Sequence, residues 1–183
     1  MTTLVLEVAV VGAGGTAAAH ARGVAATRGV LRIVAAVDPV PSRLRAFGER
    51  WAVPNLYYDL PTLLEAECSD LVALCSPPAL HREQAVACIA RGRAVLSHHP
   101  TALSLADLDA IAAATGPGRG AGGVFAGAFP ERFAPADDPR TGLAAQLTAV
   151  HAALLAGEPP PVTLADTRST VERLAGIRSG SRG

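Results

Sequence analysis

The sequence predicts an α/β protein whose core is a doubly wound parallel sheet with helices on both faces. Short apolar runs at residues 5–11, 31–37 and 71–75 lack the alternation of a half-exposed strand, so both sides of each are expected to be buried. Segments with helical spacing separate these runs. Right-handed crossovers between parallel strands leave few other topologies.

Strands and helices are expected to alternate along the first part of the chain. The expected elements are a strand at 5–11, a helix at 16–26, a strand at 31–37, a helix at 42–51 with Ser42 as its N-cap, a short strand at 56–57, a helical turn at 61–66, a strand at 71–75, a helix at 79–91, a strand at 94–97 and a helix that runs from the cap Ser104 to residue 114.

After Thr115 the regular alternation of strand and helix patterns ends. The expected elements there are a Gly-rich linker at 116–123, one further strand at 124–129, a proline-containing loop at 130–142, a helix at 143–156, a stiff turn at 157–161 and a last helix at 164–177. We therefore expect a short helical appendage at the C-terminal end.

Composition excludes several functions. The 16 basic and 16 acidic residues cancel and form no basic run, so neither nucleic acid nor a membrane surface is expected as a partner. All the basic residues are arginines, which removes Schiff-base and phosphate-clamping lysines. Cys68, Cys75 and Cys88 lack metal-site spacing and are odd in number, which favours a reducing cytoplasm. Neither a signal peptide nor a membrane span is predicted.

A glycine-rich turn carries the strongest functional signal. In VAVVGAGGTAAAH a strand leads into G-x-G-x-x-A and then into a helix. The first glycine permits a tight turn, the second lets backbone approach a diphosphate, and a small third residue lets helix and strand pack closely. The helix N-terminus offers free N–H groups to phosphate. The expected cofactor contacts are Gly12, Gly14, Gly15, Thr16 and Ala17.

Asp38 ends the second strand, about twenty positions after the glycine turn, where a Rossmann fold places its ribose-binding carboxylate. A carboxylate there accepts hydrogen bonds from both ribose hydroxyls and repels a 2′-phosphate, which favours NAD over NADP. Arg43, also expected in the site, or Arg45 could soften that preference. The alternative is that Asp38 only caps the next turn.

The loop Ser76-Pro77-Pro78 and the following His81 lie where the third long strand ends and a helix begins. Ligands of open α/β sheets bind at this carboxyl edge. We expect these residues to lie along the ribose–nicotinamide half of the cofactor. The alternative is that the two prolines simply start a helix.

His98-His99-Pro100 follows the next strand, at the same edge. A histidine there could serve as proton donor beside a nicotinamide. A metal site with His81 or His20 is not expected, because neighbours on extended backbone point in opposite directions. The remaining alternative is a polar loop without a catalytic role.

These pieces, in this order, resemble the Gfo/Idh/MocA family (glucose–fructose oxidoreductase / inositol dehydrogenase). The resemblance is carried by VAVVGAGGTAAAH, IVAAVDPVPSRLRAFGERWAVPNLYYDLPTLL, DLVALCSPPALHREQAVACIARGRAVLSHHPTALSLADLDAIAAA, GAFPERFAPA and LTAVHAALLAGEPPPVTLADTRSTVERLAGI. It implies a Rossmann domain, NAD(P)-dependent hydride transfer on sugars, cyclitols, imines or related small molecules, and frequent oligomerisation.

Two departures from the family pattern matter. The family usually carries Glu-Lys-Pro at His98-His99-Pro100, and its lysine transfers the proton, so His99 stands in the catalytic place. The family's second domain and its substrate-side histidine motif would lie between Ala136 and Leu143, where only a few residues occur. We therefore expect a dinucleotide-binding domain at 1–120 and a remnant of the second domain at 121–183, packed on the first.

Three hypotheses follow. The first is a shortened NAD(P)-binding oxidoreductase, with His99 and His98 as candidate acid–base residues. A homodimer or a partner protein would cover the nicotinamide face, because hydride transfer benefits from a dry, closed site. The second is a non-catalytic cofactor- or partner-binding module. The third is a redox-neutral biosynthetic enzyme that uses the same scaffold.

Overall fold

Strands and helices alternate along the chain as the apolar runs predict. The structure is a computed structural model that describes residues 4–115, 123–134 and 141–180. Its elements are β1 (Leu6–Val11), α1 (Gly15–Ala26), β2 (Leu31–Val37), α2 (Pro41–Trp51), β3 (Asn55–Tyr57), α3 (Leu60–Ala66), β4 (Leu71–Leu74), the 3₁₀ turn η1 (Pro78–Leu80), α4 (His81–Ala90), β5 (Ala94–His98), α5 (Leu105–Ala114), β6 (Phe125–Ala128), the 3₁₀ turn η3 (Pro130–Arg132), α6 (Gly142–Ala156) and α7 (Leu164–Gly180).

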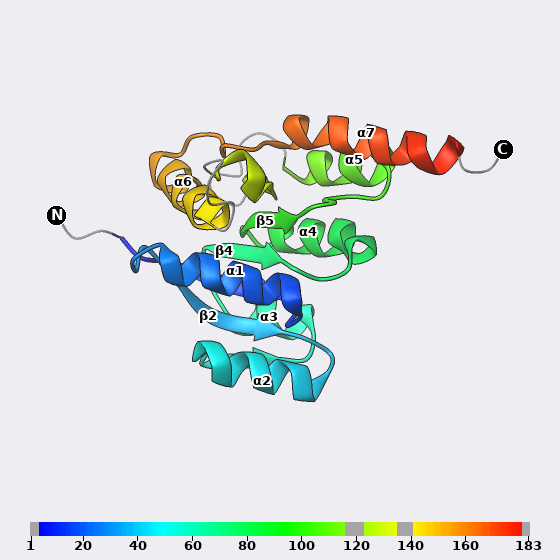
Figure 1. Ribbon diagram of the computed structural model, residues 1–183. Helices are drawn as coiled ribbons and strands as arrows, with labels where there is room; N and C mark the ends of the chain where they lie inside the picture. The colour runs from blue at the N-terminus through cyan, green and yellow to red at the C-terminus, as the bar shows by residue number, and fades with distance from the viewer. Residues whose placement is uncertain (1–3, 116–122, 135–140, 181–183) are drawn as a thin grey trace.

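The sheet has the predicted doubly wound, parallel form (Figure 1). Within the described ranges its six strands follow the order β3-β2-β1-β4-β5-β6, and every neighbouring pair is parallel. The chain moves outward from β1 in one direction through β2 and β3, then returns to place β4 on the other side of β1. This reversal brings the carboxyl ends of β1, β2 and β4 together, with Val11 beside both Val37 and Leu74.

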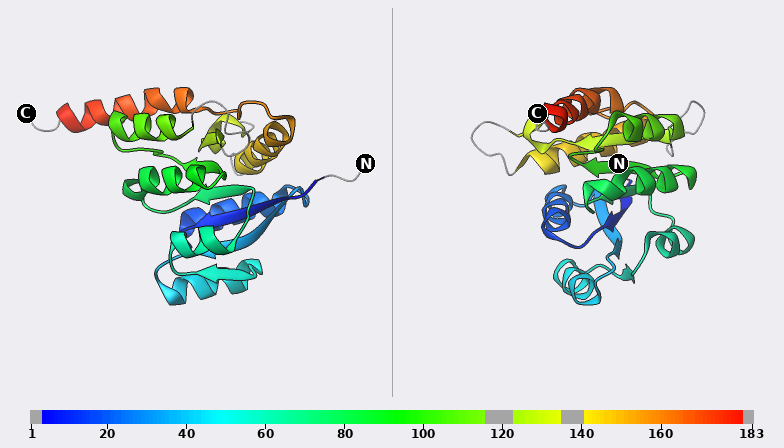
Figure 2. Two further views of the ribbon diagram at one scale, coloured as in Figure 1. Left: turned by 180° about the vertical axis from the view of Figure 1, so that it is seen from behind. Right: turned by 90° about the vertical axis from the view of Figure 1, so that its right-hand side faces the viewer.

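Helices cover both faces of the sheet, as the right-hand view of Figure 2 shows. On one face, Val8 and Val10 of β1 share an apolar cluster with residues of α1, α2 and α6. On the other face, Ala9 and Val11 pack with residues of α3, α4 and α5. Burial on both faces explains why the strand sequences show no polar alternation.

One predicted helix cap is wrong and another is confirmed. Ser42 does not cap α2, because the helix begins one residue earlier, at Pro41, after the extended Val40. Proline suits the first helical position because its fixed φ already matches a helix and its missing N–H would have no partner there. Ser104 does cap α5, since its side chain accepts a hydrogen bond from the backbone N–H of Asp107 at 3.1 Å.

The C-terminal elements belong to the same sheet and its covering layers. β6 pairs with β5, α6 packs on α1, and α7 packs on α5 and β6. Gln146, fully buried on α6, accepts a hydrogen bond from the N–H of Phe129 at 3.0 Å and donates one to the carbonyl of Gly127 at 2.6 Å. This side chain therefore fixes the end of β6 to α6. The expected boundary at residue 120, and the linker at 116–123 apart from its last residue, lie outside the described residues.

No helix in the described part of the chain has the length and apolar character needed to cross a membrane.

Candidate cofactor-binding site

The glycine turn begins where β1 leaves the sheet. Gly12 has a φ of +97°, which favours glycine strongly. A Cβ atom at this position would lie 2.9 Å from the carbonyl oxygen of Cys75 at the end of β4. Only glycine therefore lets the chain turn so close to the neighbouring strand.

The next residues open the N-terminus of α1 to a ligand. Gly14 precedes the helix in an extended conformation, and an added Cβ there would meet no atom within 4 Å. In the described part of the chain no side chain caps this helix N-terminus. Ala17, in the first turn of α1, is fully buried, as close helix–strand packing requires. Uncapped N–H groups and the positive end of the helix dipole suit a diphosphate.

Asp38 joins the glycine turn to the start of α2. One carboxylate oxygen accepts a hydrogen bond from the N–H of Ala13 at 2.9 Å, and the other accepts one from the N–H of Val40 at 2.9 Å. The guanidinium of Arg43 lies 3.6 Å from the first oxygen. Capping of the next turn is thus part of what Asp38 does. A carboxylate can accept about four hydrogen bonds, so capacity for ribose hydroxyls remains.

These groups line one cleft of about 500 Å³ at the carboxyl edge of the sheet. It lies at the point where the strand order reverses, which is where open α/β sheets bind ligands. Of the residues predicted to bind the cofactor, the cleft is lined by Gly12, Gly14, Thr16, Asp38, Arg43, Ser76, Pro77 and Pro78, but not by Gly15, Ala17 or His81.

His81 is buried behind the cleft. Its Nε2 lies 2.9 Å from the carbonyl oxygen of Ser76, while its Nδ1 lies 3.2 Å from the hydroxyl of Ser97 and 3.1 Å from the carbonyl oxygen of Pro100. Burial lowers the pKa of this imidazole, against the opposing effect of its backbone hydrogen bonds. The ring therefore connects the loop after β4 to the loop after β5. It supports the cleft from behind without lining it.

The two adjacent histidines do not diverge, so the sequence argument about their orientation is wrong. The rings of His98 and His99 stack with centroids 4.7 Å apart and planes at 21°. The reason is that β5 ends at His98, so strand alternation does not govern His99. The Nδ1 of His99 lies 2.8 Å from the carbonyl oxygen of Ala128, and its ring stacks on Phe129 at 5.2 Å.

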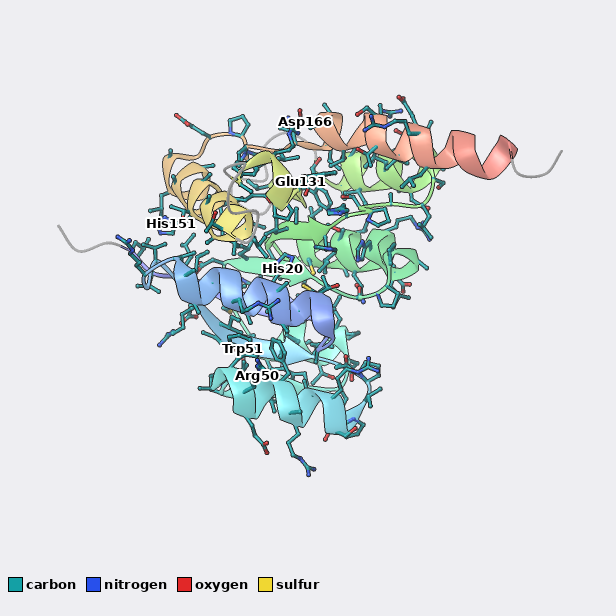
Figure 3. The ribbon with its side chains drawn as sticks, viewed as in Figure 1. His20, Arg50, Trp51, Glu131, His151 and Asp166 are labelled. Atoms are coloured by element: carbon teal, nitrogen blue, oxygen red, sulfur yellow. The ribbon has the colours of Figure 1, made fainter. Side chains whose placement is uncertain are left out.

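His20, on α1, completes a row of rings that the sequence did not reveal as a unit. Its Nε2 lies 3.4 Å from the Nδ1 of His98, across 78 residues of sequence (Figure 3 labels His20). Burial, with a smaller effect of His98, lowers the pKa of His20 to about 3. Burial, and then the neighbouring His99 and His81, lowers the pKa of His98 to about 4, with Glu131 opposing. Both rings are therefore neutral at pH 7.

The described residues contain no cluster of three or more His, Cys, Asp or Glu side chains that could hold a metal ion. His20 and His98 approach each other through ring nitrogens, and no carboxylate or thiolate of the described residues completes a metal site with them.

His99 lines a second, separate cleft of about 650 Å³. Phe129 and η3 form one side, and α7 contributes Asp166, Ser169, Thr170 and Arg173. Arg132 of η3 lies 3.8 Å from the carboxylate of Asp166. The predicted site residues that line a cleft are thus divided between two clefts, with the cofactor residues in the first and His99 in the second. His98 lines neither of the two.

The glycine turn, the carboxylate at the end of β2 and the cleft at the switch point are the features of a Rossmann-type dinucleotide-binding fold. A family model described as an oxidoreductase family with an NAD-binding Rossmann fold, GFO_IDH_MocA, matches residues 6–116. The chain belongs to this family, as its motif order predicts.

Relatives with assigned activities match about half of the chain. D-Glucoside 3-dehydrogenase of Escherichia coli K12 is 31% identical over 104 residues, which are 57% of this chain and 30% of that protein. D-Apiose dehydrogenase of Paraburkholderia graminis is 37% identical over 82 residues, or 45% of this chain and 22% of that protein. The chain thus spans less than two thirds of the length of these relatives.

Solved structures show the same fold. A probable dehydrogenase from Thermotoga maritima superposes with a TM-score of 0.64 at 29% identity, over 70% of this chain and 37% of that one. The scyllo-inositol dehydrogenase of Lactobacillus casei, solved with NAD(H) and scyllo-inositol bound, gives a TM-score of 0.63 at 22% identity, over 71% of this chain and 38% of that one.

Proposed function

We propose that this chain binds NAD(H) in the cleft beside the glycine turn and supports hydride transfer on a small sugar-, cyclitol- or imine-like substrate. One observation carries the proposal. The uncapped N-terminus of α1, the glycine turn and the carboxylate of Asp38 all border the same cleft. This combination matches the diphosphate and the adjacent ribose of a dinucleotide.

Each residue of the cleft has a distinct part in this binding. The N–H groups at the start of α1 would hold the diphosphate, and Asp38 would accept hydrogen bonds from the ribose hydroxyls. The buried charge of Asp38 disfavours a 2′-phosphate, which supports NAD over NADP. Arg43 neutralises part of that charge at 3.6 Å. The loop Ser76-Pro77-Pro78 would border the nicotinamide half, where the bound cofactor donates or accepts a hydride.

His99 is the proposed general acid–base. Because the carbonyl of Ala128 can only accept, the Nδ1 of His99 donates to it at 2.8 Å, and the Nε2 keeps a lone pair in the neutral ring. That nitrogen can accept a hydroxyl proton. The second cleft also contains carboxylates, guanidinium groups and hydroxyls, which suit a substrate rich in hydroxyl groups.

The open face of this site requires a cover. His98 and His99 are only partly buried, and water at the reacting centre weakens the electrostatic interactions that assist hydride transfer. We propose that a second copy of the chain, or a partner protein, covers the nicotinamide face.

Two measurements test the proposal. NADH added to the purified protein should show saturable fluorescence enhancement, and no enhancement at any accessible concentration would contradict cofactor binding. With an accepted sugar or cyclitol, His99→Ala should lower kcat by about 10²–10⁴-fold, the usual contribution of a general acid–base residue. Unchanged turnover would remove His99 from the mechanism.

A non-catalytic cofactor-binding module is the second candidate, and the residue composition favours it. The chain contains no lysine, and His99 stands where the family usually carries its proton-transferring lysine. NADH binding without turnover on any tested polyol, in the presence of every candidate partner, would support this module.

A further inference from the structure

The row of rings at the end of β5 contains a polar atom with no partner. The Nδ1 of His20 is buried and makes no hydrogen bond within the described residues, while its Nε2 faces the Nδ1 of His98 at 3.4 Å. The two rings meet edge to face, with centroids 5.5 Å apart. How the protons are arranged in this pair determines which nitrogen of His98 is left for a ligand.

Two arrangements satisfy the contact. In the first, His20 carries its proton on Nε2 and donates it to His98, and its buried Nδ1 is a bare lone pair. In the second, His98 donates from Nδ1, and His20 must then carry a proton on its buried Nδ1 with no acceptor. Orphaned backbone N–H donors are rarer in protein interiors than under-satisfied backbone acceptors, and we extend this preference to the ring nitrogens. Full burial of His20 therefore favours the first arrangement.

The surroundings keep both rings neutral. A protonated ring would donate from both nitrogens, so neutrality is what leaves each ring one donor and one acceptor. His20 on α1 is 1% exposed, and the titratable group that acts on it is His98. The titratable groups that act on His98 are its neighbour His99, His81 on α4 and Glu131 on η3. Burial has the largest effect on each ring and lowers the pKa of both.

We propose that His20 is a positioning residue that fixes the proton of His98 on Nε2, so that His98 offers a hydrogen-bond donor beside the bare Nε2 of His99. The Nε2 of His98 has no partner among the described residues, and it is not one of their buried unpartnered atoms. The stacked pair thus presents one donor and one acceptor, from rings whose centroids lie 4.7 Å apart.

A single hydroxyl group is complementary to this pair, because it can accept one hydrogen bond and donate another. A hydroxyl oxygen accepts from the Nε2–H of His98 while its hydrogen points to the Nε2 of His99. A lysine in either place could only donate when charged, so the two histidines specify a ligand group that both donates and accepts. This ligand assignment rests on the proposed function, whereas the tautomer of His98 does not.

The test reads the tautomer directly, in the protein without cofactor or substrate. Long-range ¹H–¹⁵N correlation spectra at neutral pH distinguish a protonated ring nitrogen from a bare one, and the His98→Asn variant identifies the His98 signals. We expect Nε2 of His98 to be protonated and its Nδ1 to be bare. A spectrum with the proton on Nδ1 of His98 would overturn the proposal.

A pair of variants assigns the effect to His20. His20→Phe keeps an aromatic ring but has no donor, so both tautomers of His98 should become populated. His151→Phe is the matched control, because His151 on α6 contacts the carbonyl of Leu4 at 2.8 Å and should leave the His98 signals unchanged. If His20→Phe does not fold, the wild-type spectrum decides alone. NADH titration of the same samples tests the proposed function separately.

Discussion

The carboxylate of Asp38 accepts a hydrogen bond from the backbone N–H of Ala13, 25 residues earlier in the sequence, at 2.9 Å. This contact ties the end of β2 to the turn that follows β1, and Asp38 is 3% exposed as a result. The proposed ribose ligand is therefore also part of the scaffold that shapes the diphosphate site. A substitution that tests the ribose-binding role of Asp38 must therefore remove its negative charge with little change to the structure of the turn.

Asp38→Asn makes that separation. The amide keeps an oxygen for one backbone N–H but loses the negative charge that favours ribose hydroxyls and disfavours a 2′-phosphate. We expect NADH affinity to fall about 10–100-fold, the usual range for a hydrogen bond to a charged group. NADPH affinity should fall less or rise. Fluorescence titration with both nucleotides measures this, and Asp59→Asn, which alters only the cap of α3, is the control.

Gly12 and Gly14 should respond to alanine in different ways. Gly12→Ala places a Cβ 2.9 Å from the carbonyl oxygen of Cys75 at a φ of +97°, so the free energy of unfolding should fall by about 1–3 kcal/mol or more. Gly14→Ala meets open space, so its urea midpoint should stay near that of the wild type while NADH binding weakens. Strong binding by a stable Gly14→Ala protein would argue against a diphosphate at this turn.

Acid should destabilise the protein through the histidines whose pKa the fold lowers. The pKa of His20 is lowered to about 3 and that of His98 to about 4, from an ordinary value of 6.5. Above pH 6.5 both histidines are neutral in the folded and in the unfolded chain, so the free energy of unfolding has its full value. As the pH falls from 6.5 toward 4, the unfolded chain takes up protons that the folded chain excludes, and the free energy of unfolding decreases.

Urea unfolding at a series of pH values measures this dependence. The slope between pH 6.5 and 4 should become shallower in His20→Phe, because that variant removes one of the histidines whose pKa the fold lowers. An unchanged slope would show that His20 is not held neutral by the fold.

Gln146 should matter for stability and for the position of His99. Gln146→Leu leaves the N–H of Phe129 and the carbonyl of Gly127 without partners in the interior, and each such group costs about 1–3 kcal/mol. Urea unfolding should show this loss, while the exposed Thr148→Ala on the same helix should change stability by less than about 0.5 kcal/mol. An equal effect of both substitutions would contradict the role of Gln146.

The parallel sheet and the alternation of its strands with helices could be predicted because their signals are local. An apolar run without alternation, a following glycine and a helix of suitable length each lie within a few residues of one another. The start of α2 was less predictable, because a proline and a serine compete for the first positions and Pro41 prevails.

The histidine row was not predictable in the same way. His20 and His98 are 78 residues apart, and only the folded chain brings α1 to the end of β5. A partial signal existed, since His20 lies three residues after the buried Ala17 and therefore on the same face of α1. For His81, the sequence placed the residue at the correct edge, but its side chain turns into the protein toward Ser76 and Pro100.

The last strand of the sheet has consequences for how copies of this protein can meet. β6 lies at one margin of the sheet, where unpaired backbone groups invite a strand from another molecule. Here the N–H of Gly127 already donates to the carbonyl of Val162, and a side chain larger than hydrogen at Gly127 would collide with Thr167. The chain thus covers its own margin at Gly127, which disfavours a continuous intermolecular sheet through β6.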